Sequence, residues 1–265
     1  GEVIRATKDV NADLFWALRG GGGNFGVVTS MEFELVATPQ MHAGMMFWNW
    51  EHTEAVYERW LEMLPQLPEE FTTTCRILQM PPFEEIPEFL RGRQIVVFNG
   101  AYLGDRETAE KLLAPMRELQ PEFDSFEDVD ASAVAYLHMD PEDPMPYSSD
   151  HLQLKLFGPE LAKQIAAVAG PGSGSPMALF ELRHGGGALT RCAPGSGARS
   201  SLAGELTYFT VAPDMPELPA EVVAGQKARV REVLQPHAID TGYLNFSETE
   251  GRLADFFDPH TFARL

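Results

Sequence analysis

Cysteine and long apolar runs are scarce in this sequence, and each shortage excludes a class of protein. The two cysteines, Cys75 and Cys192, form no CxxC motif, so the sequence does not encode a disulfide scaffold. No apolar run approaches the roughly 20 residues that a membrane-spanning helix needs. Because reduced cysteines are typical of the cytosol, we expect a cytoplasmic location.

Positive charge is also in short supply. The chain has 20 lysines and arginines against 39 aspartates and glutamates, which gives a formal net charge of -19. A surface of this charge repels nucleic acids and anionic membranes, so we expect neither as a partner. The seven histidines show no metal-binding spacing, and we expect no metal site.

Glycine is abundant in one place, the run Gly20–Gly23. A short helix is predicted before this run, and the alternating sequence of residues 27–36 predicts a strand after it. The run satisfies the dinucleotide-binding pattern GxGxxG, but that pattern requires a strand first and a helix second. A Rossmann site is therefore disfavoured. Two interpretations stay open, a tightly packed turn and a backbone surface for a flat or anionic cofactor.

The rest of the chain alternates predicted strands and helices. Two pairs of strands follow each other closely, which favours an α+β fold with one antiparallel sheet and helices packed on one face. The other face of the sheet is then free to cover a ligand. Strands are predicted at 2–6, 27–36, 42–50, 71–80, 93–102, 151–157, 177–183 and 202–211, and helices at 52–64, 105–119, 129–137, 159–169, 220–234 and from about 251.

Three segments carry a resemblance to a known family. Residues 14–29, LFWALRGGGGNFGVVT, look like the signature near the end of the FAD-binding region in oxidoreductases of the berberine bridge enzyme type, in the vanillyl-alcohol oxidase superfamily. Residues 181–188, ELRHGGGA, resemble the strand and glycine turn that line the family's substrate pocket. Residues 243–247, YLNFS, followed by 250–253, EGRL, resemble the family's Tyr-x-Asn-Tyr/Phe motif and its closing helix.

The resemblance implies an FAD-dependent oxidoreductase, specifically an oxidase, acting on a small organic substrate such as a sugar, an alkaloid or a polyketide-like metabolite. It also implies three regions: residues 1–38 as the C-terminal part of an FAD-binding domain, 39–236 as the substrate-binding domain, and 237–265 as a closing segment that returns to the FAD domain. The family's flavin-linking histidine turn has no match here. We therefore expect that an N-terminal FAD-binding half is missing, and that the chain alone binds FAD weakly and is inactive.

The resemblance also implies site residues. The expected cofactor-binding positions are Gly21, Gly22, Gly23, Asn24, Gly26, Val27 and Asn245. Flavin oxidation needs hydride transfer to the flavin and a base that takes the other proton. Several family members carry a tyrosine base where this sequence has Phe246, so the base must be another residue.

The catalytic candidates are Tyr243, Glu205 and Arg183. Arg183 ends an apolar strand before the glycine turn, where it contacts substrate or simply reaches solvent. Glu205 begins the apolar stretch 206–211 of the strand predicted at 202–211, where it enters the pocket or is an ordinary exposed position. The competing hypothesis for the whole chain is a non-catalytic α+β domain that binds a small ligand without flavin.

Overall fold

The computed structural model describes residues 1–265 except 39–40, 85, 139, 141–144 and 249–250. Its centre is an antiparallel sheet with the strand order β4-β1-β3-β2-β7-β8-β6, and β5 also pairs with β1. The predicted antiparallel sheet is confirmed. The strands are β1 (His42–Asn49), β2 (Phe71–Gln79), β3 (Gln94–Tyr102), β4 (Phe123–Asp124), β5 (Glu127–Asp128), β6 (Tyr147–Leu154), β7 (Leu179–His184) and β8 (Leu206–Pro213).

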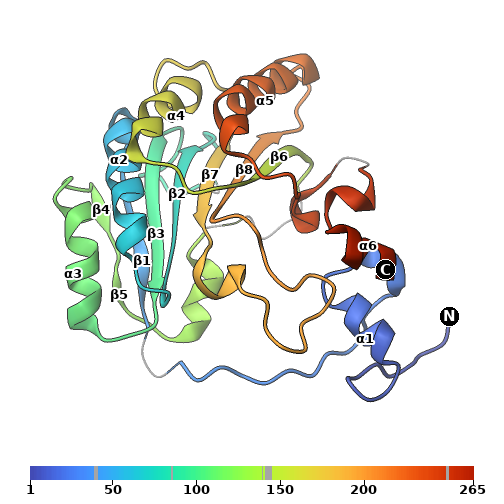
Figure 1. The fold of residues 1–265 in the computed structure, drawn as a ribbon. Coiled ribbons are helices and arrows are strands. Elements are labelled where there is room, and N and C mark those ends of the chain that lie inside the picture. Colours follow the sequence, from blue (N-terminus) through green and yellow to red (C-terminus); the bar gives the residue numbers. More distant parts are fainter. Residues whose placement is uncertain (39–40, 85, 139, 141–144, 249–250) are drawn as a thin grey trace.

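Four helices pack on one face of this sheet, as the sequence predicts (Figure 1). They are α2 (Thr53–Met63), α3 (Arg106–Arg117), α4 (Ala162–Ala169) and α5 (Ala220–Leu234). The main core lies between the two layers, because alternate strand residues such as Phe180 and Leu182 point toward the helices. Trp60 of α2 is fully buried there and donates a hydrogen bond from Nε1 to Thr73 Oγ1 (3.0 Å).

The sheet face opposite the helices is polar at its centre, and we call it the open face. Cross-strand pairing runs from Asn99 to Thr74, then to Arg183, Thr207 and Gln153, so these residues form one row across five strands. The neighbouring row is formed by Val97, Arg76, Glu181, Phe209 and His151. Because strand side chains alternate between faces, both rows project away from the helical core.

Both ends of the chain lie together beside the sheet. Figure 1 shows α1 (Ala12–Leu18) next to α6 (Pro259–Arg264), with the two termini nearby. The guanidinium carbon of Arg264 lies 3.8 Å from the centre of the Trp16 ring, and Arg264 Nη2 donates to Asp13 Oδ1 (3.0 Å). Segments from opposite ends of the sequence thus form one small unit, which the order of elements alone does not reveal.

Two predicted strands are wrong for this chain. Residues 2–6 and 27–36 form no strand, and side chains of the second segment are strongly exposed, with Val27 at 91% and Leu35 at 87%. A strand requires hydrogen bonds to a neighbouring strand, and the described part of the chain pairs none with either segment. An alternating pattern indicates an extended backbone, but it does not show that a neighbouring strand is present to pair with it.

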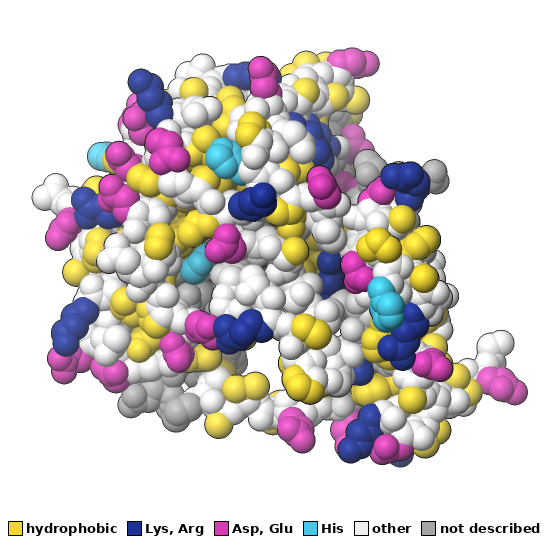
Figure 2. Space-filling view, in the orientation of Figure 1, with side chains coloured by type: hydrophobic (Ala, Val, Ile, Leu, Met, Phe, Trp, Pro, Cys, Tyr) yellow, Lys and Arg dark blue, Asp and Glu magenta, His cyan; other side chains and the backbone are white. Residues whose placement is uncertain are grey.

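Two predicted helices are corrected in extent. Residues 131–136 form a short 3-10 helix within the predicted 129–137 helix. The final α-helix begins at Pro259 rather than near residue 251, and Asp258 accepts hydrogen bonds from the amides of His260 and Thr261 (both 3.0 Å). Residues 249–250 lie outside the described residues. Charged side chains of both signs are interspersed over the face shown in Figure 2.

Candidate functional site

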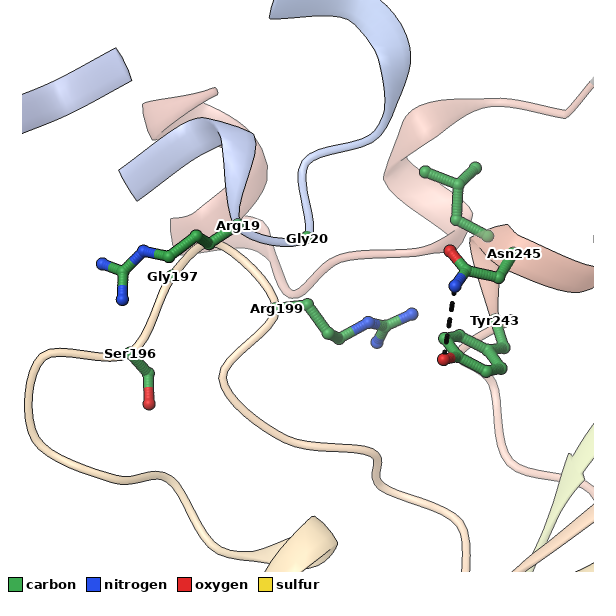
Figure 3. A pocket seen from close by; sticks show the side chains of 8 residues that line it. Arg19, Gly20, Ser196, Gly197, Arg199, Tyr243 and Asn245 are labelled. Atoms are coloured by element: carbon green, nitrogen blue, oxygen red, sulfur yellow. Dashed lines mark hydrogen bonds between the residues drawn. The ribbon is translucent and has the colours of Figure 1, made fainter. Parts of the chain in front are cut away.

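The glycine run and the Tyr-Leu-Asn-Phe segment meet at one pocket. It has a volume of about 310 Å³ and brings together residues from α1, from the loop before β8 and from the closing segment (Figure 3). The sequence predicted cofactor-binding residues in the glycine run and in the Tyr-Leu-Asn-Phe segment, and residues of both segments line this pocket. The lining residues are Arg19, Gly20, Ser196, Gly197, Arg199, Tyr243, Leu244 and Asn245.

Backbone hydrogen bonds hold this pocket together. The last carbonyls of α1 accept from the loop, with Ala198 N donating to Trp16 O (3.0 Å) and Arg199 N donating to Arg19 O (3.2 Å). Gly20 has a φ of 103°, and a Cβ there would lie 2.3 Å from Arg199 Cβ. Glycine is therefore required at this position to let the loop approach the helix end.

The predicted cofactor-binding glycines divide into two groups. Gly21 is buried, and a Cβ on Gly22 would lie 2.5 Å from Leu244 Cδ2, so this chain itself explains both positions. Gly23 is different, because an added Cβ would meet nothing within 4 Å. The same is true of Gly26, and Asn24 and Val27 are exposed beside them. Packing within the described chain therefore requires glycine at neither position 23 nor position 26, although the φ of 142° at Gly26 favours it there.

Tyr243, Asn245 and Arg199 face one another across the pocket (Figure 3). Asn245 Nδ2 donates to Tyr243 Oη (3.5 Å), and the guanidinium carbon of Arg199 lies 6.0 Å from the centre of the Tyr243 ring. Arg199 is anchored by its own donation from Nη2 to Gly242 O (2.6 Å). Burial lowers the pKa of Arg199, yet an arginine keeps its charge at neutral pH. The pocket thus holds a phenol, an amide and a fixed cation.

A second polar cluster occupies the centre of the open face. Glu181 is fully buried and accepts from Arg183 Nη2 (2.9 Å). Arg76, only 2% exposed, donates from Nε and Nη2 to Asn99 Oδ1 (3.0 and 2.6 Å) and from Nη1 to His138 O (2.8 Å). Arg76 also pairs with Glu181 across the strands and is influenced by its charge, so two guanidinium groups lie near one buried carboxylate.

Phe246 connects this cluster to the pocket. The guanidinium carbon of Arg183 lies 5.0 Å from the Phe246 ring centre and 5.9 Å from that of Phe209, and the two rings are 4.8 Å apart. Tyr243 also packs against Phe246, at 5.2 Å between ring centres. Phe246 is therefore a packing partner of Arg183 and Tyr243.

Glu205 lies apart from the other two catalytic candidates. It stands just before β8 and is exposed, and its carboxylate accepts from Leu156 N (3.1 Å). In the described part of the chain, no hydrogen bond joins it to Tyr243 or Arg183. The structure thus brings together two of the three catalytic candidates through Phe246 and places the third at a strand end.

Sequence reasoning missed Arg76, Glu181, Asn99 and Arg199. Two of them could have been found from the sequence, because Arg76 and Glu181 each interrupt an apolar strand. A charged residue inside such a run is buried only when it is paired. Arg199 had no comparable signal, since it lies in an irregular, small-residue segment.

The described residues contain neither a metal-binding cluster nor a helix that could span a membrane. No group of three or more His, Cys, Asp or Glu side chains is arranged to hold a metal ion. No helix combines the length and apolar character needed to cross a membrane.

Acidification should destabilise this fold in the pH range where histidine titrates. Burial lowers the pKa of His138, His151 and His184, and for His138 the neighbouring Arg76 lowers it further. The unfolded chain takes up protons near pH 6.5, before the folded chain does, so stability is greatest above that pH and falls as the pH drops through it. We expect urea unfolding at pH 5.5 to show a lower free energy of unfolding than at pH 7.5.

A variant with His138, His151 and His184 all replaced by Asn should lose most of this pH dependence. Replacing the exposed His52 by Asn should leave it intact. An equal free energy of unfolding at both pH values in the wild-type chain would contradict the prediction.

Comparisons with known proteins agree with the predicted resemblance. No family model matches the chain. An FAD-linked oxidoreductase of Bacillus subtilis is 31% identical over 116 residues, which are 43% of this chain and 23% of that protein. Chitooligosaccharide oxidase of Gibberella zeae is 31% identical over 123 residues, 44% of this chain and 21% of that protein. The matched stretch is thus about a quarter of each relative's length.

Solved structures match the whole chain. A BBE-like protein of Physcomitrella patens superposes with a TM-score of 0.75 at 17% identity, covering 98% of this chain and 57% of that one. 6-Hydroxy-D-nicotine oxidase of Arthrobacter nicotinovorans gives 0.73 at 20% identity, with 99% and 59% covered. The resemblance inferred from the three sequence segments is confirmed, and the chain has the fold of the C-terminal part of these proteins.

Proposed function

We propose that this chain, a homologue of FAD-linked oxidoreductases, is part of an FAD-dependent oxidase that oxidises a small organic substrate by hydride transfer to the flavin. Its sheet supplies the substrate surface, and its glycine run and closing segment supply one wall of the flavin site. The observation that carries this proposal is that Gly20, Arg199, Tyr243 and Asn245 line the same pocket. The three regions 1–38, 39–236 and 237–265 retain their proposed roles.

The residues present fit a flavin. Backbone at Gly23 and Gly26 is free of side chains and of packing partners, so a flat ring can approach it. Arg199 offers a fixed positive charge, and the Asn245 amide offers both a donor and an acceptor. When bound, FAD supplies the hydride acceptor. Its remaining contacts come, in this proposal, from sequence outside residues 1–265.

Tyr243 is the residue that we propose as proton acceptor. Its phenol lines the pocket, and Phe246 and Arg199 fix its ring. Glu205 is a weaker candidate, because its carboxylate already accepts from Leu156 N at the strand end. Arg183 is proposed to contact the substrate from the open face, on the opposite side of Phe246.

Flavin content tests the proposal directly. The protein made from the complete coding sequence should copurify with FAD and absorb near ~450 nm, whereas residues 1–265 alone should not. Gly23→Ala should lower the flavin content of the complete protein while leaving the unfolding of the isolated chain unchanged, because a Cβ at that position would meet no atom of the described residues within 4 Å.

Gly225→Ala is the matched control, since its Cβ also meets nothing within 4 Å but lies in α5, on the helical face. A complete protein without flavin absorbance would overturn the oxidase proposal in favour of a non-catalytic ligand-binding domain. Equal flavin content in the Gly23→Ala protein would overturn the assignment of this wall.

A further inference from the structure

Two arginines lie close together on the open face of a strongly acidic chain. Arg76 and Arg183 lie on neighbouring strands with Glu181 as the only buried carboxylate beside them among the described residues. The exposed Asp140 also acts electrostatically on Arg76, so the formal charges of these four side chains balance. Since the whole chain has a formal net charge of -19, an anion is repelled from most of the surface and needs direct contact with a cation such as one of these guanidinium groups to bind.

Arg183 is held in place at one edge of its guanidinium group, while the other edge makes no hydrogen bond to any described residue. Glu181 Oε2 accepts from its Nη2 atom, and its guanidinium carbon lies 5.9 Å from the Phe209 ring centre and 5.0 Å from the Phe246 ring centre. The side chain is still 36% exposed, and its Nη1 atom makes no hydrogen bond to any described residue. A guanidinium with one edge fixed and the other open to solvent is suited to bind a carboxylate.

Polar atoms without a hydrogen-bond partner among the described residues lie beside Arg183. Thr74 pairs with Arg183 across the strands and is only 6% exposed, and its Oγ1 atom makes no hydrogen bond to any described residue. Arg183 Nε is also buried without a hydrogen-bond partner among the described residues, whereas Glu181 Oε1 has His138 Nδ1 at 3.8 Å. Buried polar groups are normally satisfied, and leaving them unpaired costs stability, so a hydroxyl and a guanidinium N–H left unpaired side by side favour a polar group from outside the chain.

We propose that the open face binds the carboxylate of an organic acid, and that the substrate of the proposed oxidase belongs to this class. Arg183 is the residue that contacts the carboxylate, through its solvent-exposed edge. Glu181 is a positioning residue that orients Arg183, and Arg76 adds positive charge. The aromatic rings of Phe209 and Phe246 border the site and favour an unsaturated or aromatic body on the acid.

Only the claim that the acid is the substrate of the oxidase rests on the proposed function. Binding of the carboxylate does not depend on it, so the test needs no flavin. Benzoate is the probe, and benzamide is its neutral analogue with the same ring and nearly the same shape. Titration of isotope-labelled chain 1–265 by NMR should show benzoate shifting the amide signals of Thr74, Arg183 and Thr207. Benzamide at the same concentration should shift them little.

Arg183→Gln should weaken benzoate binding by about 10-fold or more, because a charge-assisted hydrogen bond is lost. Arg59→Gln is the matched control: Arg59 has similar side-chain exposure, 31%, and also pairs with a glutamate, but it lies on α2 on the opposite side of the sheet. Glu181→Gln should also weaken benzoate binding and, unlike a merely structural change, should alter the Nη resonances of Arg183.

Equal binding of benzoate and benzamide by the wild-type chain would overturn the proposal, and that comparison requires no variant to fold. Benzoate shifts confined to residues outside the open face would overturn it as well. Either result leaves the flavin content of the complete protein unaffected, so failure here is distinguishable from failure of the oxidase proposal.

Discussion

Replacing Tyr243 by Phe should lower the turnover of the flavin-loaded enzyme by about 10²- to 10⁴-fold, the usual contribution of a positioned general base. The change removes only the hydroxyl group. The ring keeps its packing against Phe246 and its position near Arg199, so flavin content and thermal stability should change little. Stopped-flow measurement of flavin reduction under anaerobic conditions isolates the oxidation step from reoxidation by oxygen.

Two variants make this result specific. Glu205→Gln should keep most of the flavin reduction rate, because its carboxylate caps Leu156 N at the strand end. Tyr147→Phe, at a half-exposed position at the start of β6, controls for loss of any tyrosine hydroxyl group. A large loss with Glu205→Gln and none with Tyr243→Phe would assign the base to Glu205 and refute our choice.

Replacing Glu181 by Gln should cost about 3 to 5 kcal/mol of unfolding free energy, the range measured when one partner of a buried ion pair is removed. The glutamine has the same shape and can still accept from Arg183, so lost packing contributes little. The cost arises because Arg76 and Arg183 lose their shared counter-charge. Burial already lowers the pKa of Arg76, and the Glu181 carboxylate opposes that shift.

Urea unfolding of chain 1–265, followed by tryptophan fluorescence, measures this cost. Glu62→Gln on α2 is the matched control, because Glu62 also pairs with an arginine but its side chain is 51% exposed, where ion pairs contribute little. Similar free energies of unfolding for the two variants would show that the carboxylate of Glu181 is not needed to balance the arginines.

Local sequence predicted three elements of the sheet domain closely, whereas the strand predicted at 151–157 is displaced from β6 and the short strands β4 and β5 were not predicted. The strands at 71–80 and 93–102 and the helix at 220–234 agree with β2, β3 and α5 within one residue at each end. These segments have strong periodicity and are bounded by proline, glycine or charged residues, which are signals carried within a short window. The failed strand at 27–36 had equally clear alternation, but pairing depends on a partner that no local window contains.

In the candidate site, too, some residues could be predicted from the local sequence and others only from the tertiary structure. The glycine run and the Tyr-Leu-Asn-Phe segment could be singled out because unusual backbone and family motifs are written in consecutive residues. Arg199 could not be, since its role comes from a loop that docks onto the end of α1 and reaches Gly242. The Arg76–Glu181 pairing likewise depends on which strands are neighbours, because the two residues lie more than a hundred positions apart in the chain.

By itself, the sequence determined the kind of fold, the cofactor class suggested by its motifs and the absence of a tyrosine at position 246. Periodicity, composition and short motifs are local properties, so a single sequence is enough to read them. Only the tertiary structure decided that the glycine run faces Tyr243 and Asn245, that Glu205 lies apart, and that Arg183 presents an open edge. Those facts depend on strand order, register and loop docking, which bring distant residues together through long-range packing that no local pattern encodes.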